Sequence, residues 1–115
     1  MIIIRRTDTN KHRIMGRLTA GDLNLHTKES GRYPVPAGIY DLSIEHSERY
    51  GRLLPRVTGN NQDFWLMCDN SWDELFGDIL IGFDRTFDSL TACPVGAIRL
   101  NAWIKKTGCR QVTIK

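Results

Sequence analysis

The alternation of apolar and polar residues predicts that this chain is built mainly of β-strands. From residue 39 to residue 46, the even-numbered positions Tyr40, Leu42 and Ile44 are apolar, whereas most odd-numbered positions are polar. Successive side chains of a strand point to opposite faces of the sheet, so a repeat of two residues indicates a half-buried strand. We therefore expect a strand over 39–46 that turns its even-numbered side chains toward the core.

Other apolar or alternating runs predict further strands, at 2–6, 13–18, 23–26, 53–57, 64–68, 78–83 and 111–115. Gly21-Asp22 is typical of a hairpin turn between the second and third of these runs, and 58–61 (Thr-Gly-Asn-Asn) is typical of another. Residues 28–33 are rich in polar and turn-forming types and are expected to form a loop. Pro34 and Pro36 should keep Val35 extended.

One helix is expected near the end of the chain. Pro94 suits a first helical position, where its missing N–H needs no partner. Apolar residues recur at Ala97, Leu100 and Ile104, and Gly108 suits a C-terminal cap. The pattern predicts a helix at about 94–106 in a mainly β (β-rich α+β) fold, packed on a sheet or partly closed barrel. The expected shared core is Tyr40, Leu42, Ile44, Phe64, Leu66, Ile79, Ile81, Leu100 and Ile104.

Composition is that of an ordinary globular protein and excludes few functions. The chain has 115 residues, 41% hydrophobic and 25% charged, which fits a single domain over 1–115. Its net charge of +3 comes from dispersed basic residues, so nucleic-acid binding is disfavoured. No apolar run approaches the ~20 residues that span a bilayer, so no membrane partner is expected. The start, Met1–Arg6, lacks the order of a signal peptide, and three cysteines without metal spacing favour a reducing compartment; a cytoplasmic location is expected.

The densest acidic cluster is a candidate contact surface. It contains Asp69, Asp73, Glu74 and Asp78. The spacing lacks the glycine and ligand order of a calcium loop, so no metal and no cofactor is expected. Trp72 and Phe76 stand among these acids, and aromatic residues in such a loop are typical of a surface that engages a partner or ligand. A solvated loop is the simpler alternative.

Cysteines and arginines offer other candidate chemistry. Cys68 could act as a nucleophile, but a cysteine in an apolar run is more often a small buried hydrophobe. Cys93 lies where a helix dipole can lower a thiol pKa, yet no histidine shares a motif with either cysteine. Arg49, Arg52 and Arg56 lie near Tyr50, an arrangement that suits phosphate or nucleotide recognition. A solvated strand edge protected by charge explains the arginines equally well.

The segment from Phe64 to Gly82 resembles the active-site segment of small phage and bacterial proteins related to L,D-transpeptidases. In that family a strand ends in His-x-Gly-Asn, a short acidic loop follows, and Gly-Cys opens a second strand that runs into another Gly. Here Asn70, Gly77 and Gly82 fall on their family counterparts, whereas Met67 replaces the histidine and Asp78 replaces the cysteine. A thioether cannot accept a proton near neutral pH, and a carboxylate substitutes poorly for a thiolate. The resemblance implies that the fold is kept and the reaction lost.

The resemblance covers roughly 13–106. It includes a Thr-x-Glu segment at 27–29, Pro-Ala-Gly-x-Tyr at 36–40 and a basic Leu-Pro turn at 52–55. It implies an L,D-transpeptidase-like sheet or barrel and a groove beside the loop at 69–78. The expected binding residues are Met67, Asp69, Asn70, Trp72, Asp73, Phe76, Asp78 and Arg52, with none catalytic.

The favoured function is a non-catalytic phage-type binding protein. It would engage a host factor or a small anionic ligand through this groove, in the host cytoplasm if phage-encoded. The alternative is a cysteine-dependent enzyme acting on peptidoglycan-type amide bonds, with Cys68 or Cys93 brought to a histidine by the fold. A structural or virion-associated module is a third possibility.

Overall fold

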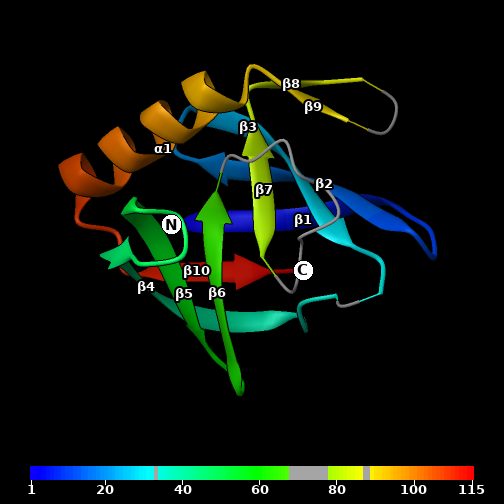
Figure 1. Cartoon of the computed structure of the whole chain (residues 1–115), viewed down its shortest axis with the longest axis horizontal. Coiled ribbons are helices and arrows are strands. Elements are labelled where there is room, and N and C mark those ends of the chain that lie inside the picture. Colours follow the sequence, from blue (N-terminus) through cyan, green and yellow to red (C-terminus); the bar gives the residue numbers. More distant parts are fainter. Residues whose placement is uncertain (33, 68–77, 87–88) are drawn as a thin grey trace.

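The computed structural model describes residues 1–32, 34–67, 78–86 and 89–115. Within them, eight strands form a closed barrel in the order β1-β10-β4-β5-β6-β7-β3-β2 (Figure 1). Its strands are β1 (Ile2–Thr9), β2 (Arg13–Ala20), β3 (Leu23–Ser30), β4 (Gly38–Ser47), β5 (Arg52–Gly59), β6 (Gln62–Met67), β7 (Ile79–Gly82) and β10 (Gln111–Ile114). A small hairpin, β8 (Asp84–Arg85) and β9 (Leu90–Thr91), and the helix α1 (Cys93–Thr107) lie outside the barrel wall. The prediction of a mainly β fold with a C-terminal helix is confirmed.

The barrel closes through two parallel strand pairs. Its other pairs are antiparallel, and most of them follow chain order, such as β2 with β3 and β4 with β5. The parallel pairs join β1 to β10, and β6 to β7. A sheet or a partly closed barrel was expected, and the pairing of the first strand with the last one closes the barrel.

The turns form where the sequence places residues that tolerate positive φ. Gly21 has φ 59° in the β2–β3 hairpin, and Asn60 and Asn61 have φ 49° and 61° between β5 and β6. Two consecutive positive φ angles match the two-residue hairpin turn whose twist suits the flanking strands. Both turn predictions are therefore confirmed.

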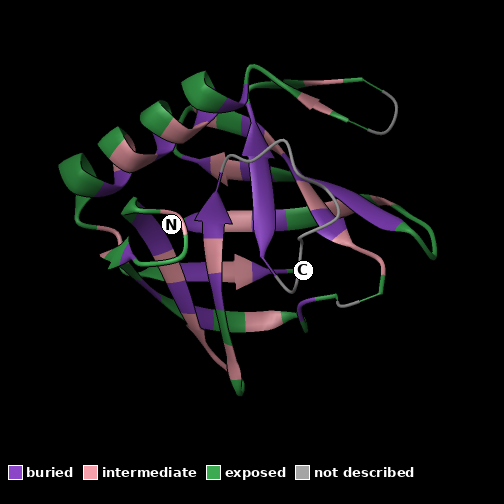
Figure 2. Cartoon of the chain, viewed as in Figure 1, coloured by how far each residue is buried: buried purple, intermediate pink, exposed green. Residues whose placement is uncertain are grey.

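Side chains fill the barrel interior, as expected for eight strands. Figure 2 shows that β7 is buried along its whole length. Eight of the nine predicted core residues are buried in one cluster: Tyr40, Leu42, Phe64, Leu66, Ile79, Ile81, Leu100 and Ile104. Ile44 is half-buried and packs against that cluster. Leu42 is 4% exposed and Leu66 is fully buried, which confirms the predicted strand register.

Residues 28–30 were predicted as loop, but they continue β3. Glu29 is 1% exposed on the buried face of that strand. Its carboxylate accepts hydrogen bonds from Arg6 of β1, at 3.0 Å from Nε and 2.9 Å from Nη2, and from the Val35 N–H at 3.2 Å. The polar composition was misleading because a two-pronged arginine contact satisfies the buried charge. The β8–β9 hairpin was also missed, since its strands are too short to show a pattern.

The helix extends from Cys93 to Thr107, close to the predicted range. Pro94 lies in its first turn, and Gly108, with φ 68°, donates its N–H to the Ile104 carbonyl at 2.9 Å. A Cβ on Gly96 would lie 2.9 Å from the Phe83 N–H nitrogen, so this glycine permits close packing of α1 on the end of β7. In the part of the chain that the structure describes, no helix is long and apolar enough to cross a membrane.

Truncation of Leu100 should destabilise the fold strongly. Leu100 is fully buried between α1 and the barrel core, so Leu100→Ala should cost about 2–5 kcal/mol of unfolding free energy through lost contacts and a cavity. Ile98, on the same helix, is 69% exposed, and Ile98→Ala should change stability by no more than about 0.5 kcal/mol. Urea unfolding measures both variants. Equal costs would contradict the helix orientation described above.

Candidate functional site

The described part of the predicted site lies on the outer face of the barrel wall, where β6 and β7 run parallel. Leu66 pairs with Ile79 and Met67 with Leu80. Leu66 and Ile79 belong to the barrel core. Because side chains alternate along a strand, Met67 and Leu80 point to the outer face, and Asp78 shares that side of β7. The two positions that the resemblance assigns to histidine and cysteine are therefore on the same face of neighbouring strands.

Met67 belongs to a small apolar cluster on this outer face. It is 1% exposed and packs with Leu54 and Leu80. Tyr50, Trp65 and Leu90 pack against these residues and are partly buried. A thioether enclosed in this way contributes packing but has no site for a proton.

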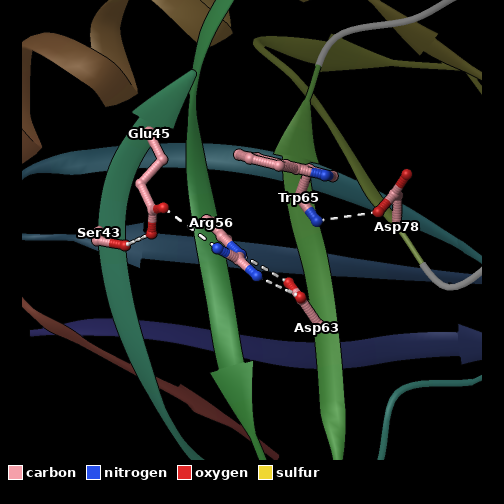
Figure 3. A network of polar contacts seen from close by, with 6 residues as sticks. All are labelled: Ser43, Glu45, Arg56, Asp63, Trp65 and Asp78. Atoms are coloured by element: carbon pink, nitrogen blue, oxygen red, sulfur yellow. Dashed lines mark hydrogen bonds and ion pairs between the residues drawn. The ribbon is translucent and has the colours of Figure 1, made fainter. Parts of the chain in front are cut away.

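Asp78 is a buried carboxylate whose two oxygens are both hydrogen-bonded. Its side chain is 4% exposed. Oδ2 accepts a hydrogen bond from the Tyr50 hydroxyl at 2.8 Å. Oδ1 accepts one from the backbone N–H of Trp65 at 2.9 Å, which Figure 3 shows. The Arg49 guanidinium lies 3.7 Å from Oδ2. Such contacts are what a charged group needs in order to be buried.

The turn between β4 and β5 positions Tyr50. Ser47, at the end of β4, is buried, and its hydroxyl oxygen accepts the Tyr50 N–H at 3.2 Å. The Ser47 carbonyl accepts the Gly51 N–H at 2.8 Å, and Gly51 adopts φ 68°, which favours glycine. A serine followed four residues later by glycine thus fixes the turn and directs the tyrosine toward Asp78.

The three arginines near Tyr50 have different surroundings. The Arg49 guanidinium carbon lies 5.2 Å from the centre of the Tyr50 ring, a cation–π distance. Arg52, the first residue of β5, is exposed. Arg56 instead belongs to an ion-paired network on the outer face of β4, β5 and β6 (Figure 3). For Arg56, the alternative of a charged strand surface is the better description.

The Arg56 network involves two carboxylates that it keeps ionised. Arg56 Nε lies 2.9 Å from Asp63 Oδ1, and Nη1 lies 3.2 Å from Glu45 Oε1. Hydrogen bonds from Arg56 lower the pKa of Asp63. Those from Ser43, and then from Arg56, lower the pKa of Glu45.

Several predicted site residues lie outside the described residues. They are Asp69, Asn70, Trp72, Asp73 and Phe76, together with Cys68. Of the predicted set, the structure thus places Met67, Asp78 and Arg52. It adds Tyr50 and Trp65, which the sequence did not indicate as partners of Asp78, and Ser47, which holds Tyr50. Tyr50 was noted only as a neighbour of the arginines, because a contact across 28 residues leaves no local signal.

The described cysteines and histidines are not brought together as a catalytic pair. Cys93 is buried at the start of α1, and Cys109 donates from Sγ to the Gln111 carbonyl at 3.3 Å. Neither makes a hydrogen bond to a histidine within the ranges given above. Burial, and then the charges of Arg17 and Arg85, lower the pKa of His26. Across the same ranges, no three metal-ligating side chains gather.

Comparisons with protein-family models, with curated proteins and with solved structures found no match to this chain. The relationship to L,D-transpeptidases therefore stays a prediction that rests on the motif residues. The proposal of a function therefore rests on the closed barrel and on the contacts of Asp78.

Removal of the Tyr50 hydroxyl tests how Asp78 is held. Tyr50→Phe leaves one oxygen of a buried carboxylate without its 2.8 Å hydrogen bond, so it should lower the unfolding free energy by about 1–3 kcal/mol. Arg49→Gln is the matched control, because that side chain is 45% exposed and 3.7 Å away, and it should cost less than about 1 kcal/mol. Chemical denaturation compares the two. A larger loss in Arg49→Gln would assign the support of Asp78 to the ion pair instead.

Proposed function

We propose that this chain is a non-catalytic binding protein built on a transpeptidase-like barrel. It binds a host protein or a small anionic ligand at the surface formed by Arg49, Tyr50 and Arg52 next to Asp78, the last residue of the segment 69–78 beside which the resemblance implies a groove. The proposal rests on the burial and hydrogen bonding of Asp78. The resemblance assigns this carboxylate to the position of the family nucleophile, and both of its oxygens accept internal hydrogen bonds.

The surroundings of Asp78 support a structural rather than a reactive role. A nucleophile has to present a lone pair to the substrate and needs a base or a lowered pKa to be active. Asp78 is buried and directed at Tyr50 and the Trp65 amide. Met67, where the family has its histidine, is enclosed by leucines. A fold that has lost its reacting groups can still bind through shape and charge.

Charge and aromatic character next to Asp78 support an anionic partner. Arg49 and Arg52 are exposed, and Tyr50 presents an aromatic ring beside Arg49. Guanidinium groups bind carboxylates and phosphates in two-pronged geometry, and their contacts with aromatic rings hold them in place. The phage-type character of the protein follows from the resemblance alone.

A panel of small anions tests the proposed site. Inorganic phosphate, AMP, glucose 6-phosphate and citrate are added to the full chain, and the thermal midpoint is measured. At least one should raise the midpoint, because a ligand that binds only the folded state stabilises it. The rise should disappear in Arg49→Gln/Arg52→Gln and persist in Lys106→Gln, a control that removes a positive charge from α1 and not from this surface. An equal rise in the double variant would place the anion elsewhere.

Trp72 is expected to be an anchor for the partner or ligand. A large aromatic residue among acids is typical of an interface, so Trp72→Ala should weaken binding of the ligand found above by more than about tenfold. Its thermal midpoint should stay close to that of the wild type. If Trp72 instead packs back onto the sheet, Trp72→Ala lowers the thermal midpoint and leaves the affinity per folded molecule unaltered. That result would contradict the assigned role. Calorimetric titration and thermal melting of the same variant distinguish the two.

A further inference from the structure

One edge of β4 lacks a strand neighbour along half of its length. β10 pairs with β4 only from Gly38 to Asp41. β5 pairs with the other edge of β4 from Asp41 to Ser47. Upstream of Gln111 the chain turns away through 108–110 into α1. In the portion of the chain with described structure, residues 43–47 of β4 are therefore paired on one side only.

The hydrogen-bonding groups of this open edge can be assigned. The Leu42 N–H donates to the Arg110 carbonyl at 2.8 Å, on the side away from β5. In an antiparallel strand, backbone groups of every second residue point to the same side. The N–H and C=O groups of Ile44 and His46 thus face the open edge. Pro55 lies opposite Ile44 in β5 and has no N–H to donate, which agrees with this assignment.

A groove runs along this edge. It has a volume of about 370 Å³, and β4 forms one wall while the end of α1 and the following turn form the other. Its lining residues are Leu42, Ser43, Ile44, Ile104, Lys105, Gly108, Cys109 and Arg110. Figure 1 shows the C-terminal end of α1 beside the end of β4. The volume lies within the range of known ligand sites.

The groove has an apolar floor and a positive rim. Leu42, Ile44 and Ile104 supply the apolar part. Lys105 and Arg110 form no ion pair with any described carboxylate. α1 contains no acidic residue, and the nearby carboxylate of Glu45 is bound to Ser43 and Arg56. The charge of the rim is therefore complementary to an anionic group.

We propose that this groove binds an extended peptide that carries a carboxylate at its carboxyl end. The peptide adds to β4 as an antiparallel strand and continues the line of β10. β10 runs antiparallel to β4, so a peptide in that line points its carboxyl end at Arg110. There Arg110 and Lys105 bind the carboxylate, as in other recognition of peptides by strand addition.

Among the described residues, this edge carries none of the common features that prevent such an addition. Natural sheets protect free edges with lysine, proline or bulges. Residues 42–47 contain no lysine or proline, and their pairing with β5 shows no register shift. Alternate side chains of the peptide would contact Leu42 and Ile104 in the groove, while its backbone bonds to Ile44 and His46. The residues that line this groove do not include Arg49, Tyr50, Arg52 or Asp78, so each proposal is tested by its own variants.

The backbone contact is tested with two substitutions at one residue. The probe is the synthetic peptide acetyl-Thr-Val-Thr-Val-Asp with a free carboxyl terminus, titrated into the ¹⁵N-labelled full chain. The amide signals of Ile44, His46 and Arg110 should shift. His46→Pro removes an outward N–H and should weaken binding by about tenfold or more, whereas His46→Ala keeps that N–H and should stay within about twofold. Unshifted signals, or equal affinity in the two variants, would overturn the strand addition.

The charge contact has its own controls. Lys105→Gln/Arg110→Gln should weaken binding by about fivefold or more, while Lys106→Gln, next to the groove but not lining it, should stay within about twofold. An amidated peptide and a peptide with Asn in place of Asp then show whether the terminal or the side-chain carboxylate is bound. If neither change weakens binding, or the double variant keeps wild-type affinity, the carboxylate assignment is wrong. Circular dichroism confirms that each variant is folded.

Discussion

Insertion of the last strand between β1 and β4 is the constraint on which the rest of the structure depends. β10 pairs in parallel with β1 and antiparallel with β4, and its Val112 and Ile114 are buried in the core. The Lys115 N–H adds a bond to the Ile4 carbonyl at 2.9 Å. Without β10 the barrel would have two open edges and an exposed interior. Because β10 is short, it also leaves half of one β4 edge unpaired, so closure and the open edge have the same origin.

The burial of Asp78 likewise depends on how separate elements of the barrel pack together. The parallel pairing of β6 and β7 places this carboxylate against the Trp65 amide, and the turn after β4 supplies the Tyr50 hydroxyl. A buried carboxylate that lacked these donors would cost several kcal/mol. The position that the resemblance assigns to chemistry is thus occupied by a group whose partners come from the strand β6 and from the turn between β4 and β5. Its contacts are those of a structural residue.

The strands and the helix could be predicted because their signals are local. The alternation over 39–46 correctly predicted the buried face of β4, and Pro94 and Gly108 correctly predicted the ends of the helix. Features that depend on distant residues could not be predicted. Glu29 was assigned to a loop because its partner Arg6 is 23 residues away in the sequence. The hydrogen bond of Tyr50 to Asp78 likewise spans 28 residues and has no local signal. Closure of the barrel likewise depends on pairing between the first and last strands, which no local pattern encodes.

Ion pairs on the outer face of the barrel link β4 to its neighbouring strands. Arg56 of β5 bonds to Glu45 of β4 and to Asp63 of β6, so one guanidinium ties three strands together. The pKa of each carboxylate is lowered, from 4.5 for Glu45 and 3.8 for Asp63. The contribution of these contacts is therefore fully present above those values and is lost as the pH falls through the lower pKa values of the folded state. Near neutral pH these contacts link β4 to β5 and β6, which would reduce the entropy cost of the strand addition proposed above.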